Sequence, residues 1–153
     1  MKEHTNAPSG LAATASPSCT CFRLRKLGRL LSQRYDAALA PAGINVNQFS
    51  ILRRADRAEN TIGKLAQELG MDRTTLTRDL KHLVDAQWVR LAIGEDSRQK
   101  RVVVTAAGKR VIARALPLWQ ATQDAVESGI GSSALGHLHA SLDHLTRHME
   151  SDQ

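Results

Sequence analysis

A glycine between two short amphipathic segments constrains the fold more than any other feature of this sequence. Thr61 stands where it can cap a helix whose leucines face inward, and Gly70 supplies the left-handed residue that ends such a helix. Asp72 can then cap a second helix. The apolar residues of that second helix recur at spacings of three and four: Leu76, Leu80, Leu83 and Val84. Two short helices joined by a glycine turn are typical of a helix-turn-helix unit.

An ordinary helical hairpin is the alternative, and the next segment decides between the two. Alternating apolar residues from Trp88 to Ile93 and the β-branched run from Val102 to Val104 predict two strands. A hairpin directly after a helix-turn-helix indicates a winged helix-turn-helix. We therefore expect a mainly α fold with a small β-wing, flanked by N- and C-terminal helices that form a dimerisation region.

The turn between those two strands carries more charge than a chain reversal needs. Arg98 and Lys100 are predicted to meet DNA phosphates or the negative potential of a narrow minor groove. Asp96 is predicted to pair with a nearby arginine and so to hold the shape of the turn. A charged turn alone would indicate only solvation, but after a helix-turn-helix it indicates a wing.

The distribution of charge also favours a polyanionic partner. The net charge is +6, and residues 22–110 carry 18 basic and 9 acidic residues, whereas residues 111–153 carry 2 and 5. Aromatic residues make up only 3% of the chain, which argues against a stacking platform for single strands. Excess charge alone would indicate only solubility, but after a winged helix-turn-helix it favours double-stranded DNA as the partner.

Helices are predicted on both sides of the winged unit, the second of them beginning near Val46 with Asn45 or Asn47 as its cap. A long helix follows Thr105, and Pro117 is expected to kink or interrupt it. A last helix begins at Ser132 or Ser133. Its apolar residues form a seam that favours a homodimer: Leu135, Leu138, Leu142, Leu145 and Met149.

These elements predict three parts of the chain. Residues 1–18 read as a disordered tail, residues 19–45 and 106–151 as dimerisation helices, and residues 46–105 as the DNA-binding region. No apolar run is long enough for a membrane span and no signal peptide precedes the helices, so we expect a cytoplasmic protein without a membrane partner.

No catalytic or cofactor motif accompanies these features. The sequence has no phosphate-cradling glycine-rich loop and no Gly-x-Ser-x-Gly elbow, so we expect neither an enzyme nor a cofactor. His144 and His148 lie one helical turn apart, but no carboxylate or cysteine accompanies them as a metal site would require. We therefore expect no metal site there.

Two cysteines, Cys19 and Cys21, leave a redox function open. Cys21 would lie in the first turn of the first helix, where the helix dipole favours a thiolate, and Arg25 adds a cation one turn later. Cys19 could act as a partner thiol or complete a soft-metal ligand pair. The remaining alternative is that both cysteines are inert.

The order of these elements resembles the MarR family of bacterial transcriptional regulators over residues 20–149. The stretch EDSRQKRVVVTAAGK is similar to the family's wing and the start of its next helix, RTTLTRDLKHL to its recognition helix, and LAPAGINVNQFSIL to the joint between its first two helices. The resemblance implies a homodimer that binds a pseudo-palindromic operator, usually as a repressor, and releases it in response to a small ligand or an oxidant. It also implies DNA contacts by a set of residues: Arg73, Thr74, Thr77, Arg78, Lys81 and, on the wing, Arg98.

The surroundings of Cys21 resemble the organic-peroxide-sensing branch of that family, where a cysteine at this place is the reactive thiol. Tyr35 matches one of the two tyrosines that this branch places near the sulfur, and Arg25 stands where the other would be. Two other functions stay open from the residues alone. One is a thiol- or metal-binding sensor or oxidoreductase that uses Cys19 and Cys21, and the other is an architectural DNA binder without an effector.

Overall fold

The computed structural model describes residues 19–58, 60–94, 96 and 98–151. The tail predicted over residues 1–18 lies outside this part of the chain. The elements follow in this order: α1 (Thr20–Leu39), the short 3-10 helix η1 (Ala40–Ala42), α2 (Val46–Arg57), β1 (Asn60–Thr61), α3 (Ile62–Glu68), α4 (Arg73–Asp85), β2 (Val89–Ile93), β3 (Lys100–Val104), α5 (Ala106–Ile130) and α6 (Ser132–Ser151).

The predicted caps of the helices around the winged unit are confirmed. Thr61 accepts a hydrogen bond from the amide of Lys64 at 3.3 Å, and Asp72 accepts one from the amide of Thr75 at 2.8 Å. At the start of α5, Thr105 accepts from the amide of Gly108 at 3.1 Å. Each bond satisfies an N–H group that has no partner inside its own helix, so the sequence fixes where these helices begin.

Of the two asparagines offered for α2, Asn45 is the cap. Its side chain accepts from the amide of Gln48, and the Gln48 side chain accepts from the amide of Asn45, which together form a capping box. The first amide of α2, that of Val46, donates to Asp36 of α1 at 2.7 Å. This bond ties the joint between the first two helices to the end of α1.

The predicted helix-turn-helix is formed by α3 and α4. Gly70 has a φ of +62°, the left-handed conformation that ends α3 and lets α4 turn back. The inward leucines of both helices, Leu65, Leu76, Leu80 and Leu83, are almost completely buried. They share one core with α2 and with the sheet, so the unit packs as predicted.

The sheet has three antiparallel strands in the order β1-β3-β2. The two long strands form the wing, with Val89 opposite Val104 and Ile93 opposite Lys100. The two-residue strand β1 was not predicted, because a pair of residues is too short to show a period; it pairs Thr61 with Arg101 on the other edge of β3. The start of α3 is thereby joined to the first half of β3.

The expectation that Pro117 interrupts the long helix is wrong. Helix α5 runs unbroken from Ala106 to Ile130, with Pro117 inside it, and the chain breaks only at Gly131. A proline removes the hydrogen bond to the carbonyl four residues earlier, here that of Ala113. Pro117 and Ala113 are both exposed, so water can serve that carbonyl, while buried residues on the opposite side, such as Ala115, hold the helix in place.

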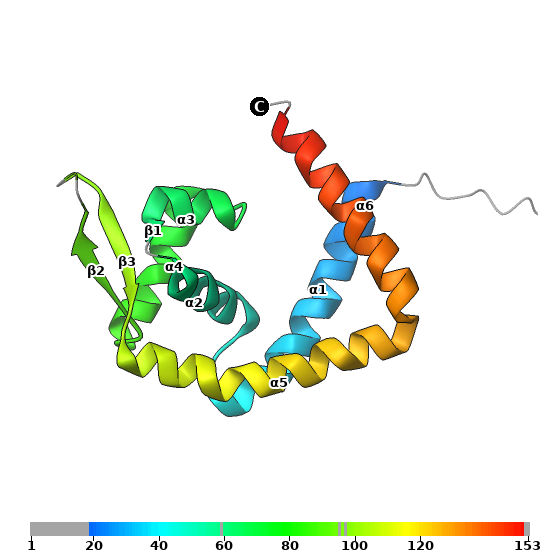
Figure 1. Cartoon of the computed structure of the whole chain (residues 1–153), viewed down its shortest axis with the longest axis horizontal. Coiled ribbons are helices and arrows are strands. Elements are labelled where there is room, and N and C mark those ends of the chain that lie inside the picture. Colours follow the sequence, from blue (N-terminus) through cyan, green and yellow to red (C-terminus); the bar gives the residue numbers. More distant parts are fainter. Residues whose placement is uncertain (1–18, 59, 95, 97, 152–153) are drawn as a thin grey trace, which may run out of the picture.

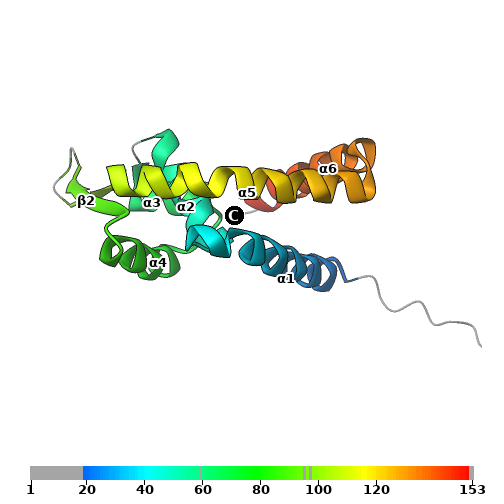
Figure 2. The ribbon, with the colours of Figure 1, turned by 90° about the horizontal axis from the view of Figure 1, so that it is seen from below.

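Helix α5 connects the two ends of the molecule. Figure 1 shows the winged unit near its N-terminal end and α6 leaving its C-terminal end, with α1 lying between them. In the view of Figure 2, α4 and α1 lie on the same side of α5. Tyr35 of α1 is buried against this helix and donates its hydroxyl hydrogen to Gln123 of α5 at 2.6 Å.

Candidate nucleic-acid interface

Helix α4 turns a polar, basic face toward the solvent. Its leucines hold the opposite face in the core, and this packing leaves five side chains of the predicted DNA-contacting set exposed: Arg73, Thr74, Thr77, Arg78 and Lys81. Thr74, Thr77 and Lys81 follow one another at three and four residues, so they lie on one stripe. Such a stripe can reach along one groove of a duplex.

The N-terminal end of α4 is held by Asp72. Its carboxylate accepts from the hydroxyl of Thr75 at 2.5 Å as well as from the Thr75 amide. These hydrogen bonds to the charged form lower the pKa of Asp72, the side-chain bond contributing most. The carboxylate therefore stays charged at neutral pH and keeps the first turn of α4 in place.

Two of the exposed polar groups on α4 are already engaged. The Thr77 hydroxyl donates to the carbonyl of Arg73 at 2.7 Å, which leaves its methyl group and its oxygen lone pairs for an outside partner. The Arg78 guanidinium lies 3.9 Å from Asp79, and Asp79 also accepts from Asn47 of α2 at 2.9 Å. Asp79 thus links α4 to α2 while it stays beside Arg78.

The turn of the wing is shaped by Asp96. Its carboxylate accepts from the backbone amide of Arg98 at 2.9 Å, and its carbonyl accepts from the amide of Gln99 at 2.8 Å. The contact is therefore with the main chain of an arginine, whereas the sequence suggested its guanidinium. Within the part of the chain that the structure describes, the exposed side chains of Arg98 and Lys100 form no ion pair.

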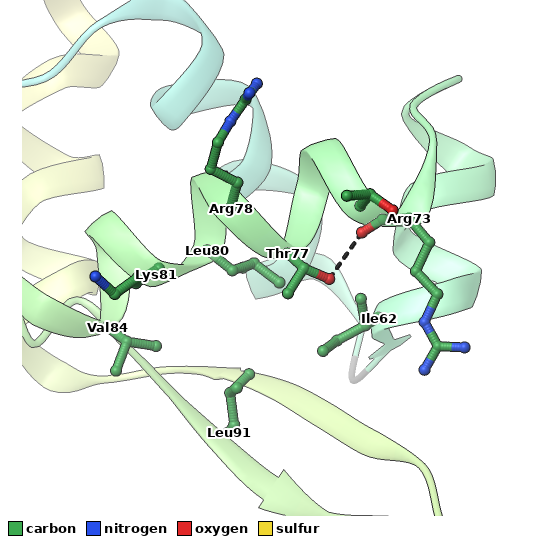
Figure 3. Close-up of a pocket in the computed structure, with 9 residues that line it drawn as sticks. Ile62, Arg73, Thr77, Arg78, Leu80, Lys81, Val84 and Leu91 are labelled. Carbon is green, nitrogen blue, oxygen red and sulfur yellow. Dashed lines mark hydrogen bonds between the residues drawn. The ribbon is translucent and has the colours of Figure 1, made fainter.

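The two predicted parts of the interface meet around common hollows. Arg73 of α4 and Lys100 of β3 line one small cavity of about 120 Å³, together with residues at the start of α3. A larger groove of about 740 Å³ separates α4 from β2. Figure 3 shows this groove with Leu91 of β2 facing the side of α4 that carries Val84.

The floor of that groove is apolar, and the sequence did not reveal it. Val84 was expected to face inward with the leucines, yet 36% of its surface is exposed, and Leu91 is 39% exposed. The inward positions of α4 are filled by Leu76, Leu80 and Leu83, so Val84, one residue past Leu83, points about 100° away around the helix. This angle between Val84 and Leu83 is the feature of the sequence that could have indicated that Val84 is exposed.

A second hollow, of about 600 Å³, lies between α2, the turn before α4, and α5. Two aromatic rings line it, those of Phe49 and Trp119, with their centroids 6.2 Å apart. Arg53 lies over the Phe49 ring at 5.8 Å. Arg54 and Arg57 complete a basic wall, in which Arg54 is 3.8 Å from Glu68.

The residues of the candidate redox site are not brought together within one chain. Cys19 caps α1, where its sulfur accepts from the amide of Phe22 at 3.4 Å, and Cys21 lies in the first turn. Both thiols are exposed, as is Arg25. Tyr35 is fourteen residues further along the same helix, about 21 Å from Cys21, so it does not contact that sulfur.

The hydroxyl of Tyr35 is held elsewhere. Its burial, partly opposed by the nearby charge of Arg34, raises the pKa of the phenol above its ordinary value, and its hydrogen bond goes to Gln123. Among the described residues, no group of three or more histidine, cysteine or acidic side chains is arranged to hold a metal ion.

Known proteins share this arrangement of helices and wing. The sequence profile of the MarR family matches residues 44–100. The transcriptional regulator MosR of M. tuberculosis, solved in complex with DNA, is 34% identical and superposes with a TM-score of 0.82; the match covers 88% of this chain and 98% of MosR. This chain belongs to the MarR family.

Two further relatives agree with that assignment. The uncharacterized HTH-type transcriptional regulator YwoH of Bacillus subtilis is 32% identical over 88 residues, which make up 54% of this chain and 61% of YwoH, less than two thirds of that relative. The transcriptional repressor CouR, bound to a 23-mer DNA duplex, is 20% identical with a TM-score of 0.77 over 84% of this chain and 92% of CouR, a likeness of fold alone.

This MarR-family protein is therefore a DNA-binding transcriptional regulator with a winged helix-turn-helix. Its relatives in these comparisons are regulators of transcription, not enzymes. None of the helices among the described residues combines the length and the hydropathy that a membrane span needs.

Proposed function

We propose that this MarR-family regulator is a homodimeric repressor that reads a pseudo-palindromic operator. Residues 46–105 would bind DNA, with α4 in the major groove and the wing in the adjacent minor groove. The observation that supports the proposal is that two basic elements meet at one small cavity, which Arg73 of α4 and Lys100 of β3 both line. Arginine and threonine on α4 suit guanine edges, thymine methyl groups and phosphates.

Unpartnered apolar side chains on the terminal helices support the homodimer. Phe22 is 61% exposed and Leu30 is 55% exposed on α1, and Met149 is 56% exposed on α6. Leu135 is the one buried residue among those described on α6. A second copy of the chain would cover both surfaces, which assigns residues 19–45 and 106–151 to dimerisation.

The affinity for the operator would be measured by fluorescence anisotropy with a duplex taken from the DNA upstream of the protein's own gene and with a scrambled duplex. Arg78→Ala should weaken binding and lower the slope of affinity against salt by about one unit, as the loss of one phosphate contact does. Arg114→Ala, an exposed arginine on α5, serves as the matched control and should bind like the wild type. Equal binding to both duplexes would instead favour an architectural DNA binder.

The dimer is tested separately by analytical ultracentrifugation. The wild type should sediment as a dimer, and Leu30→Asp should shift it toward a monomer, because an aspartate would be desolvated at the covered surface. A wild type that remains monomeric at micromolar concentration contradicts this part of the proposal.

The basic aromatic hollow supports release by a small ligand. Its size lies within the range of ligand pockets, about 300–1,000 Å³. Phe49 and Trp119 offer an apolar surface, and three arginines against one glutamate favour an anion. Since Leu69 and Met71 line it at the helix-turn-helix turn, a ligand there could shift α4. Arg53→Ala should then abolish the response to an anionic aromatic compound that releases the wild type from its operator.

Thiol oxidation is the second route of release, and the exposure of Cys19 and Cys21 supports it. A hydroperoxide would transfer one oxygen to the Cys21 thiolate, giving a sulfenate and an alcohol. The sulfenic acid would then condense with a thiol, such as that of Cys19, to give a disulfide and water. Peroxide should release the wild type from DNA but not Cys21→Ser; release of both, or of neither, would remove this route.

A further inference from the structure

We propose that the groove between α4 and β2 seats one sugar–phosphate strand of the operator, with its apolar floor packed against deoxyribose. This inference rests on the proposed docking of α4 and goes beyond it, because it assigns a role to the apolar residues Ile62, Val84 and Leu91. These side chains line the groove and belong to neither the basic set nor the wing tip.

The position of the groove points to a backbone strand. One wall is α4, which would lie in the major groove, and the other wall is the wing strand β2, whose tip would reach the adjacent minor groove. The part of a B-form duplex that separates a major groove from its neighbouring minor groove is a single sugar–phosphate strand. An element in each groove therefore brackets that strand, and the hollow between them must hold it.

The charges of the lining complement such a strand. Arg73, Arg78 and Lys81 line the groove, and its lining includes no acidic residue. Figure 3 shows Arg73 and Lys81 toward opposite ends of the helix segment, while Arg78 points away from β2. Arg73 and Lys81 are eight residues apart, about 12 Å along α4, so they can meet phosphates on either side of the seated sugars.

The floor suits deoxyribose better than it suits phosphate. Val84 and Leu91 keep 36% and 39% of their surfaces exposed, and the buried side chains of Ile62 and Leu80 belong to the same apolar lining. Deoxyribose has no 2′-hydroxyl and presents C–H groups that can pack on these side chains. Burial of this surface would add affinity that does not depend on salt, in contrast to the contacts of the lysine and arginines.

The test is a double variant, Val84→Thr with Leu91→Thr, which places one hydroxyl group on the floor at each position. Threonine keeps the β-branched shape of Val84, and at position 91 it introduces a β-branched side chain that a strand accepts. Val84 and Leu91 each have about a third of their surface left to bury. Replacing both should therefore weaken binding about tenfold, on the operator and on a random duplex alike, and should leave the slope of affinity against salt unchanged. Ile130→Thr is the matched control, because Ile130 is 52% exposed at the end of α5, outside both the groove and the wing. It should bind like the wild type.

Three results would overturn the proposal. The first is a double variant that binds DNA as tightly as the wild type. The second is a loss of affinity accompanied by a lower slope of affinity against salt, which is the result expected when a phosphate contact is lost, as in Lys81→Gln. The third is a loss confined to one thymine position that disappears when uracil replaces that thymine, since the floor would then touch a base methyl group. Circular dichroism and thermal melting of the double variant establish that it is folded. A wild type that binds no duplex would refute the proposed function itself.

Discussion

Replacing Gly108 with alanine should destabilise the protein, because the fold leaves no room for a methyl group there. A Cβ at this position would lie 2.2 Å from the carbonyl oxygen of Trp88 and 2.8 Å from a methyl carbon of Val104. The Trp88 carbonyl cannot easily retreat, since it also accepts hydrogen bonds from the amide and the hydroxyl of Thr105, at 3.0 and 3.2 Å. The first turn of α5 is therefore packed directly on the backbone at the root of the wing.

Two opposing effects decide how much Gly108→Ala lowers the free energy of unfolding. Alanine is favoured over glycine in a helix interior by about 1 kcal/mol. Overpacking of a tight site costs about 1–3 kcal/mol and occasionally more, and a clash with a fixed carbonyl lies at the upper end. The net loss should be about 2 kcal/mol, which for a chain of this size lowers the melting temperature by roughly 4–8 °C.

Guanidinium unfolding of the wild type and the variant at the same protein concentration measures this loss, because any concentration-dependent contribution is then equal in both. Gly129→Ala is the matched control, since Gly129 lies in the same helix with no atom within 4 Å of its added Cβ. That variant should be as stable as the wild type or slightly more stable. If Gly108→Ala proved as stable as Gly129→Ala, the close approach of α5 to Trp88 would be refuted.

Three further predictions concern Tyr35, Asp72 and Gln87. Tyr35 is the single tyrosine of the chain and burial raises its pKa, so tyrosinate absorbance should show a titration midpoint above 10.0. Its contribution to stability is complete at pH values below the pKa of the unfolded protein and is lost as the pH rises through the pKa of the folded protein. The pKa of Asp72 is lowered, so this carboxylate contributes to stability at pH values above its ordinary pKa of 3.8, and the contribution is lost as the pH falls through the pKa of the folded protein. Thermal melts of Asp72→Asn should therefore show a weaker loss of stability in acid. Gln87 has a φ of +60°, so Gln87→Gly should raise the free energy of unfolding by about 0.5–1 kcal/mol, and a decrease would show that its side chain stabilises the turn.

The helix-turn-helix and its caps could be predicted from sequence because their signals are local. Thr61, Asp72 and Thr105 each bond an amide three residues away, and Gly70 needs only its own backbone conformation. Such contacts are fixed by neighbouring residues and do not depend on how the chain folds back. The hydrogen bond from Tyr35 to Gln123 spans 88 residues, and no local pattern could have revealed it.

The apolar residues of the candidate site show where periodicity fails. A helical spacing of three and four identifies a stripe, but it does not tell the centre of the stripe from its edge: Val84 is about 40° from Leu80 and about 100° from Leu83, so it lies at the edge. Likewise, Leu91 is two residues from Val89 and shares its face of β2, yet Val89 is buried and Leu91 is exposed. The difference arises because β2 is an edge strand, whereas Val102, opposite Leu91 on the central strand β3, is fully buried. Whether an apolar side chain lies in a core or on a binding surface depends on what covers it, and that is a property of the whole fold.

The junction at Trp88 explains how a signal received far from the DNA could reach the wing. Thr105 and Gly108 hold the first turn of α5 against the residues that precede the wing. Helix α5 continues without a break to Ile130, and α6 begins two residues later. The wing, the hollow lined by Trp119 and the proposed dimer surface are therefore all attached to one helix. A ligand in that hollow would contact α5 at Trp119 as well as the turn before α4, and an oxidised thiol on α1 would act through α5, because α1 packs along it through Tyr35. In either proposed route, a displacement of α5 would carry the base of the wing with it, because Gly108 packs directly against the carbonyl of Trp88.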